Sequence, residues 1–244
     1  MRVHVLDLEG GMMTISHSFH DLLSGLSRSN LENQTVRYVR RGKPWQADLL
    51  LVKLNGNLGL VKDYSKRPWL TRMFVGRVST WRERAIYQKL QGLPGIPRFF
   101  GRLDRYALVV EYIPGQAASQ VKPGLVGTEF FDRLQSVVDR IHQRGIVLCD
   151  LRHTANIIVS DRGEPFLVDF CTAFERGGRW NIFKKWLYDL FHQDDLLGIA
   201  KLKKHLAPEL LSDEERDKLE RGLFLQGPAI RIRNFSRKWL KKLV

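Results

Sequence analysis

The chain has 244 residues, of which 43% are hydrophobic, and it carries 40 Lys and Arg residues against 26 Asp and Glu residues. This length and apolar content suffice for one large domain or two lobes, and they exclude an intrinsically disordered chain. The net charge of +14 favours anionic partners without identifying the anion. Neither a run of about eighteen apolar residues nor a secretory signal pattern is visible, so we expect a cytoplasmic protein.

The first half of the chain is predicted to be rich in β-structure. Apolar runs bounded by turn residues predict strands over residues 35–41, 47–55, 58–64, 98–101 and 107–112. A hairpin turn is expected at Gly56-Asn57. Between the third and fourth strands the apolar spacing becomes helical within residues 69–93, and Gly92 is placed to end that helix. A further helix is conceivable over residues 15–26, but it suggests no role.

The second half is predicted to be mainly helical. A helix over residues 128–145 ends at Gly145, and about four more helices follow Phe170. The short connector 113–116 joins the halves, which predicts two lobes with a cleft between them. We divide the chain into an N-terminal extension (1–33), a β-rich lobe (34–112), a helical lobe (113–226) and a basic C-terminal helix (227–244).

One stretch, IVLCDLRHTANIIVSDRGEPFLVDF from Ile146 to Phe170, places polar residues around two apolar runs. Asp150 and Asn156 precede the first run, and Asp169 follows the second. The two runs are expected to pair around the turn SDRGEP, which brings Asn156 and Asp169 to one end of a hairpin. Phosphoryl transfer needs a carboxylate for the attacking hydroxyl and oxygen ligands for Mg²⁺. Asp150 is therefore predicted to be the base, and Asn156 and Asp169 the metal ligands.

A cation for the triphosphate completes this set. Lys62 lies at the end of a predicted strand, and Glu83 lies on the following helix, where it could pair with the lysine. The order and spacing of these two residues and the three above resemble the signature set of protein kinases.

The chain resembles the lipopolysaccharide kinase branch of the protein-kinase-like superfamily, which includes the Kdo and heptose kinases and is more distantly related to RIO-type kinases. The resemblance covers about residues 34–204 and is most specific in RERAIYQKLQGLPGIPRFFG, VVEYIPG, DLRHTANIIV and LVDF. It implies an α+β, bilobal protein-kinase-like fold with a β-rich N-lobe and a reduced helical C-lobe. It also implies ATP and Mg²⁺ as cofactors, a hydroxyl acceptor, and a contribution of Glu111 in VVEYIPG to the nucleotide site.

The loops depart from the kinase pattern in several ways. Leu148-Cys149 replaces the His-Arg pair before the catalytic Asp, so regulation through a phosphorylated activation loop is not expected. Five residues separate Asp150 from Asn156 where most kinases have four, so either the loop bulges or His153 takes part of the role. Cys171 replaces the glycine of the metal motif and suggests a stiffer turn.

Two further departures concern the substrates. Gly42 is the one glycine in RRGKPWQADLLLV ahead of Lys62, which predicts weaker backbone cover for the phosphates. No Ala-Pro-Glu segment follows Asp169, which leaves little platform for a peptide.

Each assignment has a structural alternative. Lys62 could be an edge-strand lysine, and Asp169 could cap a turn. Glu83, between Arg82 and Arg84, could be one charge on a solvated helix face. Asp195 resembles the acid that holds the kinase catalytic loop from a buried helix, but Asp194 and Asp195 could equally be first-turn charges of a solvated helix. The two cysteines, Cys149 and Cys171, are expected to be reduced packing residues.

Three functions remain open: a kinase acting on a sugar hydroxyl of a membrane glycolipid, a Ser/Thr protein kinase, and a catalytically weak nucleotide-binding module that docks on an anionic partner. The resemblance and the missing peptide platform favour the first, and nucleic acid is the less favoured anion.

The basic C-terminal segment 227–244 bears on where the protein works. Its apolar residues recur at spacings of three and four, at Ile232, Phe235, Trp239 and Leu243. Such a helix could pack on the helical lobe or lie on the anionic inner face of the membrane. Five upstream lysines could extend the same surface: Lys184, Lys185, Lys201, Lys203 and Lys204.

Overall fold

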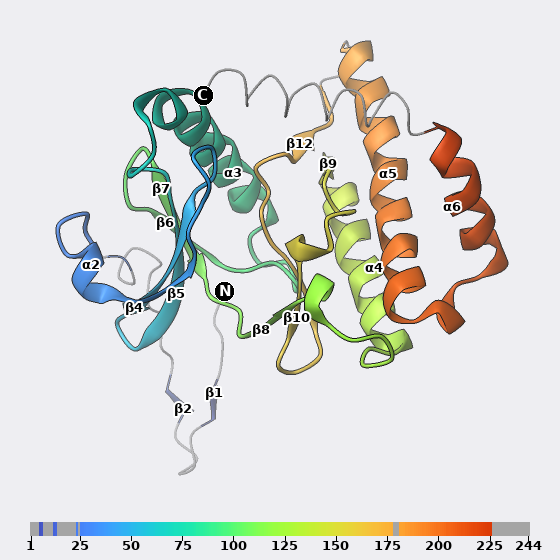
Figure 1. Ribbon diagram of the computed structural model, residues 1–244, viewed down its shortest axis with the longest axis horizontal. Helices are drawn as coiled ribbons and strands as arrows, with labels where there is room; N and C mark the ends of the chain where they lie inside the picture. The colour runs from blue at the N-terminus through green and yellow to red at the C-terminus, as the bar shows by residue number, and fades with distance from the viewer. Residues whose placement is uncertain (1–4, 7–11, 14–22, 24, 178–180, 226–244) are drawn as a thin grey trace.

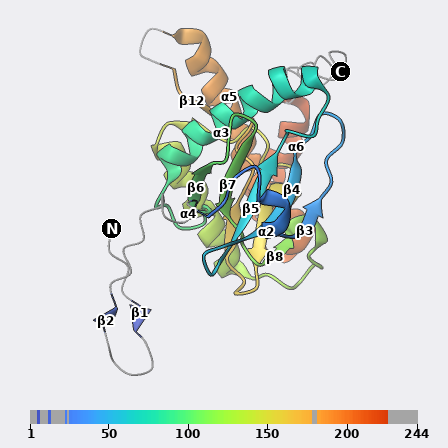
Figure 2. The same ribbon diagram turned by 90° about the vertical axis from the view of Figure 1, so that its left-hand side faces the viewer.

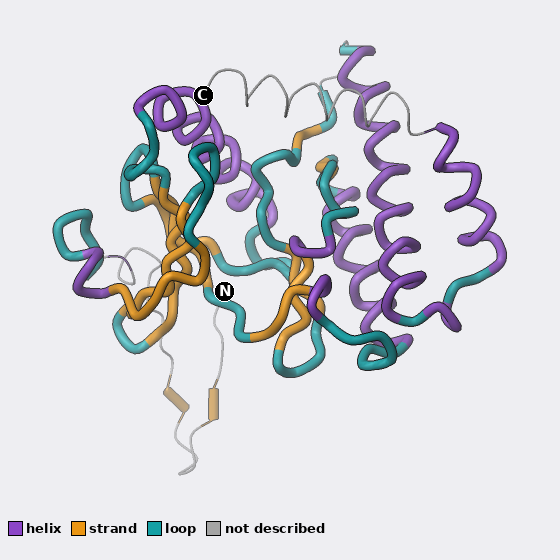
Figure 3. The backbone as a smooth tube through the Cα atoms, viewed as in Figure 1, coloured by secondary structure: helices purple, strands orange, loops and turns teal. Residues whose placement is uncertain are grey.

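The computed structural model describes residues 5–6, 12–13, 23, 25–177 and 181–225. Strands gather in one lobe and long helices in the other, with short strands between them (Figures 1 and 3). The helix considered for residues 15–26 falls largely outside the described residues, and the predicted C-terminal helix falls wholly outside them. No helix in the described ranges has the length and apolar character needed to cross a bilayer.

The N-lobe is built on one antiparallel sheet in the order β3-β4-β5-β7-β6. Its strands are β3 (Thr35–Arg40), β4 (Asp48–Leu54), β5 (Asn57–Asp63), β6 (Phe99–Arg102) and β7 (Ala107–Glu111). The five expected strands are therefore present. The predicted turn was wrong by one residue: Leu54 pairs with Asn57, and the turn is Asn55-Gly56. Both turn residues have positive φ, 42° and 85°, the conformation in which Asn-Gly is favoured over Gly-Asn.

The two faces of the sheet have different partners, because successive strand residues point to opposite sides. Val61 and Val109 face an apolar cluster that includes Leu26 and Leu31. Leu31 begins the short helix α2 (Leu31–Gln34). The end of the segment expected to be an extension thus packs on the outer face of the sheet. Lys62, the neighbour of Val61, points to the opposite face.

That opposite face is covered by the helix predicted within residues 69–93. It begins as a π-helical turn, η1 (Thr71–Gly76), and continues as α3 (Arg77–Leu90). Ile86, Tyr87 and Leu90 pack against the sheet in the main core. Gly76 allows a close approach, since a Cβ at this position would lie 2.8 Å from Cβ of Tyr64.

The C-lobe contains the helices α4 (Thr128–Gln143), α5 (Ile182–Leu206) and α6 (Asp213–Leu225). Between the lobes lie the short strands β8 (Gly115–Ala117), β9 (Ile146–Val147), β10 (Ile157–Ser160), β11 (Pro165–Leu167) and β12 (Phe174–Glu175). The remaining short elements are β1 (Val5–Leu6), β2 (Met12–Met13), η2 (Ala118–Gln120), η3 (Thr154–Asn156) and η4 (Pro208–Leu210).

About four helices were expected after Phe170, whereas the described residues there form two α-helices and one 3₁₀ turn. The reason is α5, a single uninterrupted helix of 25 residues. As predicted, β10 and β11 pair in an antiparallel hairpin, with Ile157 opposite Leu167.

Candidate active site

Lys62 joins three elements that are distant in the sequence. Its Nζ donates to Oε2 of Glu83 at 2.8 Å and to Oδ1 of Asp169 at 2.7 Å. The lysine comes from β5, the glutamate from α3, and Asp169 follows β11. Lys62 is 8% exposed and Glu83 is 2% exposed, so this part of the cluster is buried. The alternatives of an edge-strand lysine and a solvated Glu83 are both wrong.

The charges of the cluster are interdependent. Burial by itself raises the pKa of Asp169, but the adjacent Lys62 charge outweighs it and lowers this pKa to about 2. Burial opposes the charged form of Lys62 as well, yet Asp169 and Glu83 together raise its pKa well above the ordinary value. Burial raises the pKa of Glu83, and Lys62 counteracts only part of this rise. The ammonium group is thus held charged at neutral pH between two carboxyl groups.

The loop after β11 is held against α3. Asp169 adopts a positive φ of 67°, a conformation that non-glycine residues rarely take. The next residue, Phe170, is buried and makes an edge-to-face contact with Tyr87 of α3, with ring centroids 4.9 Å apart. The N–H of Cys171 faces Oδ1 of Asp169 at 3.4 Å. These contacts fix the direction of the Asp169 carboxylate relative to Lys62.

The loop that carries Asp150 is suspended from α5. Asp195 is fully buried, and its carboxylate accepts from the backbone N–H groups of Leu148 at 2.8 Å and of Cys149 at 3.1 Å. Cys149 has a positive φ of 64°. The buried-helix reading of Asp195 is therefore correct. The solvated-helix-start alternative is wrong, because Asp194 and Asp195 lie in the middle of α5 and both are buried.

Three residues that the sequence reasoning missed support the same loop. His142 of α4 lies with its Nε2 3.0 Å from Oδ2 of Asp195. Arg152 pairs with Asp194 at 3.1 Å. Gly198 allows α5 to approach the loop, since a Cβ there would lie 3.2 Å from the backbone N of Arg152. The sequence contained one signal for this support: two adjacent acids, Asp194 and Asp195, lie among the apolar residues of the helix α5.

Asp150 and Asn156 lie on either side of two consecutive turns. The N–H of His153 donates to the Asp150 carbonyl at 3.0 Å, and the N–H of Asn156 donates to the His153 carbonyl at 2.8 Å. The five residues between Asp150 and Asn156 are folded into these two turns. Nδ2 of Asn156 donates to the Asp150 carbonyl at 3.3 Å. The imidazole of His153 lies 3.7 Å from Oδ1 of Asp150, beyond hydrogen-bond distance.

Asp150, Asn156 and Asp169 line one small pocket, formed by the loop after β9 and the residues at the end of β11 and after it. Asn156 is also joined to the strand before Asp169, because the N–H of Val168 donates to the Asn156 carbonyl at 2.9 Å. An amide and a carboxylate thus meet at one end of the β10–β11 hairpin, as predicted. Oxygen donors of this kind suit Mg²⁺, which usually takes one or two carboxylates together with substrate phosphates.

Glu111 is the one predicted site residue that the structure leaves apart from this cluster. It ends β7, and its carboxylate accepts from the backbone N–H and the guanidinium of Arg98, each at 3.0 Å. Its side chain is therefore directed to Arg98, the residue just before β6.

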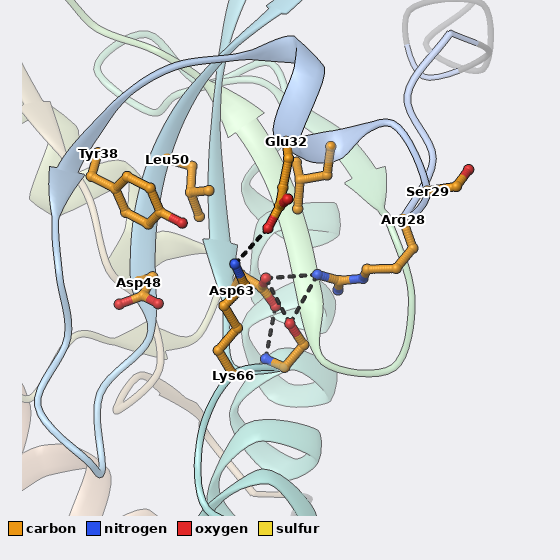
Figure 4. Close-up of a pocket in the computed structure, with 10 residues that line it drawn as sticks. Arg28, Ser29, Glu32, Tyr38, Asp48, Leu50, Asp63 and Lys66 are labelled. Atoms are coloured by element: carbon orange, nitrogen blue, oxygen red, sulfur yellow. Dashed lines mark hydrogen bonds and ion pairs between the residues drawn. The ribbon is translucent and has the colours of Figure 1, made fainter.

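A larger pocket, of about 140 Å³, lies on the outer side of the N-lobe and contains no predicted site residue. Figure 4 shows Arg28 reaching Asp63 there, while Lys66 pairs with Glu32. Arg28 also donates to Oγ of Ser65 at 3.0 Å. Arg28 also bonds Asp104, so the pocket wall fastens the segment before β3 to the sheet.

The surroundings of both cysteines disfavour the thiolate form. Burial raises the pKa of Cys149 and that of Cys171 well above the ordinary value, and neighbouring carboxylates raise both further. A thiol with a raised pKa is a poor nucleophile at neutral pH.

Comparisons with known proteins bear on the fold. No family model matches the sequence, and no curated protein matches it. Among solved structures, the Rio2 kinase–ADP/Mg²⁺–phosphoaspartate complex from Chaetomium thermophilum is similar with a TM-score of 0.57 and 14% identity, over 87% of this chain and 68% of that one. A second Rio2 kinase structure from the same organism has a TM-score of 0.53 and 14% identity, over 85% of this chain and 76% of that one.

At this identity the likeness establishes the architecture. It confirms the predicted bilobal α+β arrangement, and at 14% identity it shows the fold alone. The chain has the protein-kinase-like fold seen in the Rio2 kinases.

Proposed function

We propose that the protein is an ATP-dependent phosphotransferase that uses Mg²⁺ and transfers the γ-phosphate to a hydroxyl group. The observation that carries this proposal is the buried Lys62, which is bonded to Glu83 and to Asp169, because Asp169 also lines the pocket of Asp150 and Asn156. Such a set supplies charge neutralisation, metal ligands and a base, which are the elements that phosphoryl transfer requires.

Each side chain has a defined task in this proposal. Asp169 and Asn156 would hold the metal ion, which supplies charge stabilisation to the phosphates when it is bound. Lys62 binds the phosphates, and Glu83 orients it. Asp150 accepts the proton of the acceptor hydroxyl while the new O–P bond forms and ADP departs. The Rio2 kinase with a similar fold contains ADP and Mg²⁺, which supports this choice of cofactors.

For the acceptor we propose a sugar hydroxyl of lipopolysaccharide or of a related membrane glycolipid. The sequence resemblance supports this choice, and so does the short route from Asp169 to α5. Residues 170–181 connect them, and within this segment β12 already pairs with β9. Glu175 of β12 is further tied to Lys89 of α3 by an ion pair. A connection of this length, whose described part is paired with β9 and α3, presents little surface to a peptide.

The alternatives differ in the acceptor. A Ser/Thr protein kinase would use the same residues, and a nucleotide-binding module would bind ATP without transferring phosphate. Phosphorylation of the protein itself on an aspartate is a further candidate, because the similar Rio2 kinase structure contains a phosphoaspartate.

The test has two stages. First, thermal unfolding is measured with ATP, with and without Mg²⁺, and a Mg²⁺-dependent rise of the midpoint is expected. Second, transfer from γ-labelled ATP is measured to lipopolysaccharide, protein and RNA, and labelled protein is treated with hydroxylamine, which cleaves an acyl phosphate. Label in the lipid fraction supports the proposal. Label in added protein alone would reject the glycolipid acceptor in favour of a protein. Hydroxylamine-sensitive label on the chain itself would reject it in favour of an aspartate of the chain. Absence of any nucleotide effect would reject the kinase assignment.

We also propose peripheral contact between segment 227–244 and an anionic membrane. Its basic and apolar residues suit the interface, and each basic residue near such a surface contributes about 1 kcal/mol. The expected result is sedimentation with anionic vesicles that weakens in high salt. Unchanged binding after replacement of four tail residues by Gln, namely Arg237, Lys238, Lys241 and Lys242, would reject a role of the tail.

A further inference from the structure

Large apolar side chains are exposed mainly on two segments of the described chain. Twelve such side chains are exposed, and eight of them lie in residues 69–81 and 182–186. Isolated exposed apolar residues are common on protein surfaces, whereas a concentration of them marks an interaction site. We call six of these residues the aromatic surface: Trp69, Phe74, Trp81, Ile182, Phe183 and Trp186.

The first segment comprises η1 and the start of α3. Phe74, Val78 and Trp81 follow each other at spacings of four and three, and all three are exposed. Trp81 lies on the side of α3 opposite Ile86 and Leu90, which are buried against the sheet. This helix therefore has a second apolar stripe, and no element in the described residues covers it.

The second segment is the first turn of α5. Residues 181–186 are all exposed, with Ile182 at 80%, Phe183 at 67% and Trp186 at 50%. The rings of Phe183 and Trp186 lie 6.0 Å apart and form one cluster. The first turn of α5 therefore contributes little to the core of the lobe, whereas later residues of the helix, such as Ile199 and Leu202, are buried in it.

The two segments lie at the same end of the molecule. In Figure 1 and in the perpendicular view of Figure 2, α3 and the N-terminal end of α5 both lie at the top. Strand β12 lies between them at this end (Figure 1). The chain from Asp169 to Ile182 thus runs from the candidate active site to the aromatic surface.

The two segments are basic in sequence, although Lys66 is paired with Glu32 and Arg67 with Asp48. Residues 66–82 contain five Lys and Arg and no carboxylate, and residues 176–188 contain four Lys and Arg and no carboxylate. Arg77, Lys184 and Lys185 are exposed. These three exposed cations favour an anionic partner, and the exposed rings favour one that accepts apolar side chains.

We infer that the aromatic surface docks on an anionic lipid membrane. Lipid headgroups satisfy the charge, and the interfacial region accepts Trp, Phe and Ile. A second copy of the chain would bring like charges together, and so would the basic C-terminal segment of this chain. RNA would satisfy the charge and stack on the aromatic rings, but it offers no apolar phase for Ile182.

This inference rests on the proposed function in one respect: docking at this end would present a membrane-bound acceptor beside the segment that leads to Asp169. Lys201 and Lys203 take no part, because they lie near the opposite end of α5 from Lys184, and Lys203 is paired with Glu215. Only Lys184 and Lys185 therefore belong to this end of α5. The segment 227–244 lies outside the described residues, so the expectation that all five lysines extend its surface stays a prediction.

The test measures binding of the full chain to sedimented vesicles of phosphatidylcholine with and without phosphatidylglycerol. The wild type is expected to bind the anionic vesicles. Phe183→Ser combined with Trp186→Ser, and separately Lys184→Gln combined with Lys185→Gln, should each weaken binding on the order of tenfold. Leu125→Ser is the matched control, because Leu125 is 71% exposed but lies outside both segments.

Each outcome bears on the inference. Equal binding by the wild type and both double variants would overturn it. So would preferred binding of single-stranded RNA, or a concentration-dependent dimer in light scattering that the serine variant abolishes. The Mg²⁺–ATP thermal shift is measured on the same variants. Retention of the shift shows that they are folded, and vesicle binding without any shift in the wild type would reject the kinase and leave the docking surface intact.

Discussion

Replacing Lys62 by methionine should destabilise the protein by stranding a buried charge. Glu83 is 2% exposed and bonds Lys62 at 2.8 Å. Removing one partner of a buried ion pair costs about 3–5 kcal/mol, because the other charge loses its compensation and cannot reach water. We expect about 3 kcal/mol at pH 7, at the lower end, because Glu83 can take up a proton instead. Asp169 adds little to this destabilisation, because its side chain is 33% exposed and solvent screens its charge.

The same reasoning predicts how the variant responds to pH. Burial already raises the pKa of Glu83 in the wild type, and removal of the Lys62 charge raises it further. A folded-state pKa above the unfolded value means that the folded state binds more protons. The Lys62→Met variant should therefore lose stability as pH rises above about 4.5, until the folded-state pKa is passed.

Urea denaturation, followed by circular dichroism, of the wild type, the two single variants and the double variant Lys62→Met/Glu83→Gln measures this coupling. The double variant should be more stable than Lys62→Met, because no charge is stranded. Glu83→Gln alone should cost less than Lys62→Met, because Asp169 still pairs with the lysine. The reasoning is refuted if Lys62→Met lies within about 0.5 kcal/mol of the wild type, or if the second substitution restores nothing.

Four further predictions follow from the site. Asp150→Asn should abolish phosphate transfer in the labelled-ATP assay and retain the ATP thermal shift; loss of that shift in a folded variant would contradict its role as the base. Asp169→Ala should remove the Mg²⁺-dependent part of the shift, and a remaining Mg²⁺ effect would exclude Asp169 as a ligand. Asp195→Ala leaves two buried N–H groups without their acceptor and should cost about 2–5 kcal/mol in urea denaturation, with Asp195→Asn costing less; equal values would argue against these hydrogen bonds. The folded-state pKa of Asp169 is about 2 and its ordinary value is 3.8, so the stability that its charge contributes is present above about pH 4 and is lost as pH falls to 2. If urea denaturation shows that the wild type loses no more stability than Asp169→Asn in this pH window, the assignment is contradicted.

Local sequence signals were sufficient for the elements and for the composition of the site. Apolar periodicity located the five strands of the N-lobe, α3 and α4, because it reflects which face of an element is buried. The hairpin between Asn156 and Asp169 followed from two short apolar runs around a turn. Residue type and order then selected Lys62, Asp150, Asn156 and Asp169, since each chemical task needs a particular functional group.

Tertiary structure decided what depends on partners from distant segments. The sequence left open whether Glu83 faced solvent or Lys62. It also left open whether Asp195 was a solvated charge or the support of the Asp150 loop. The helical period predicts which residues share a face of the helix, but it does not predict which element covers that face. Lys62 and Asp169 are 107 positions apart and meet only because α3 and the loop after β11 pack together. The sequence also could not predict that the side chain of Glu111 pairs with Arg98. Nor could it predict the aromatic surface. Its two segments are about a hundred residues apart in the chain, and the docking of the two lobes alone places them at one end of the molecule.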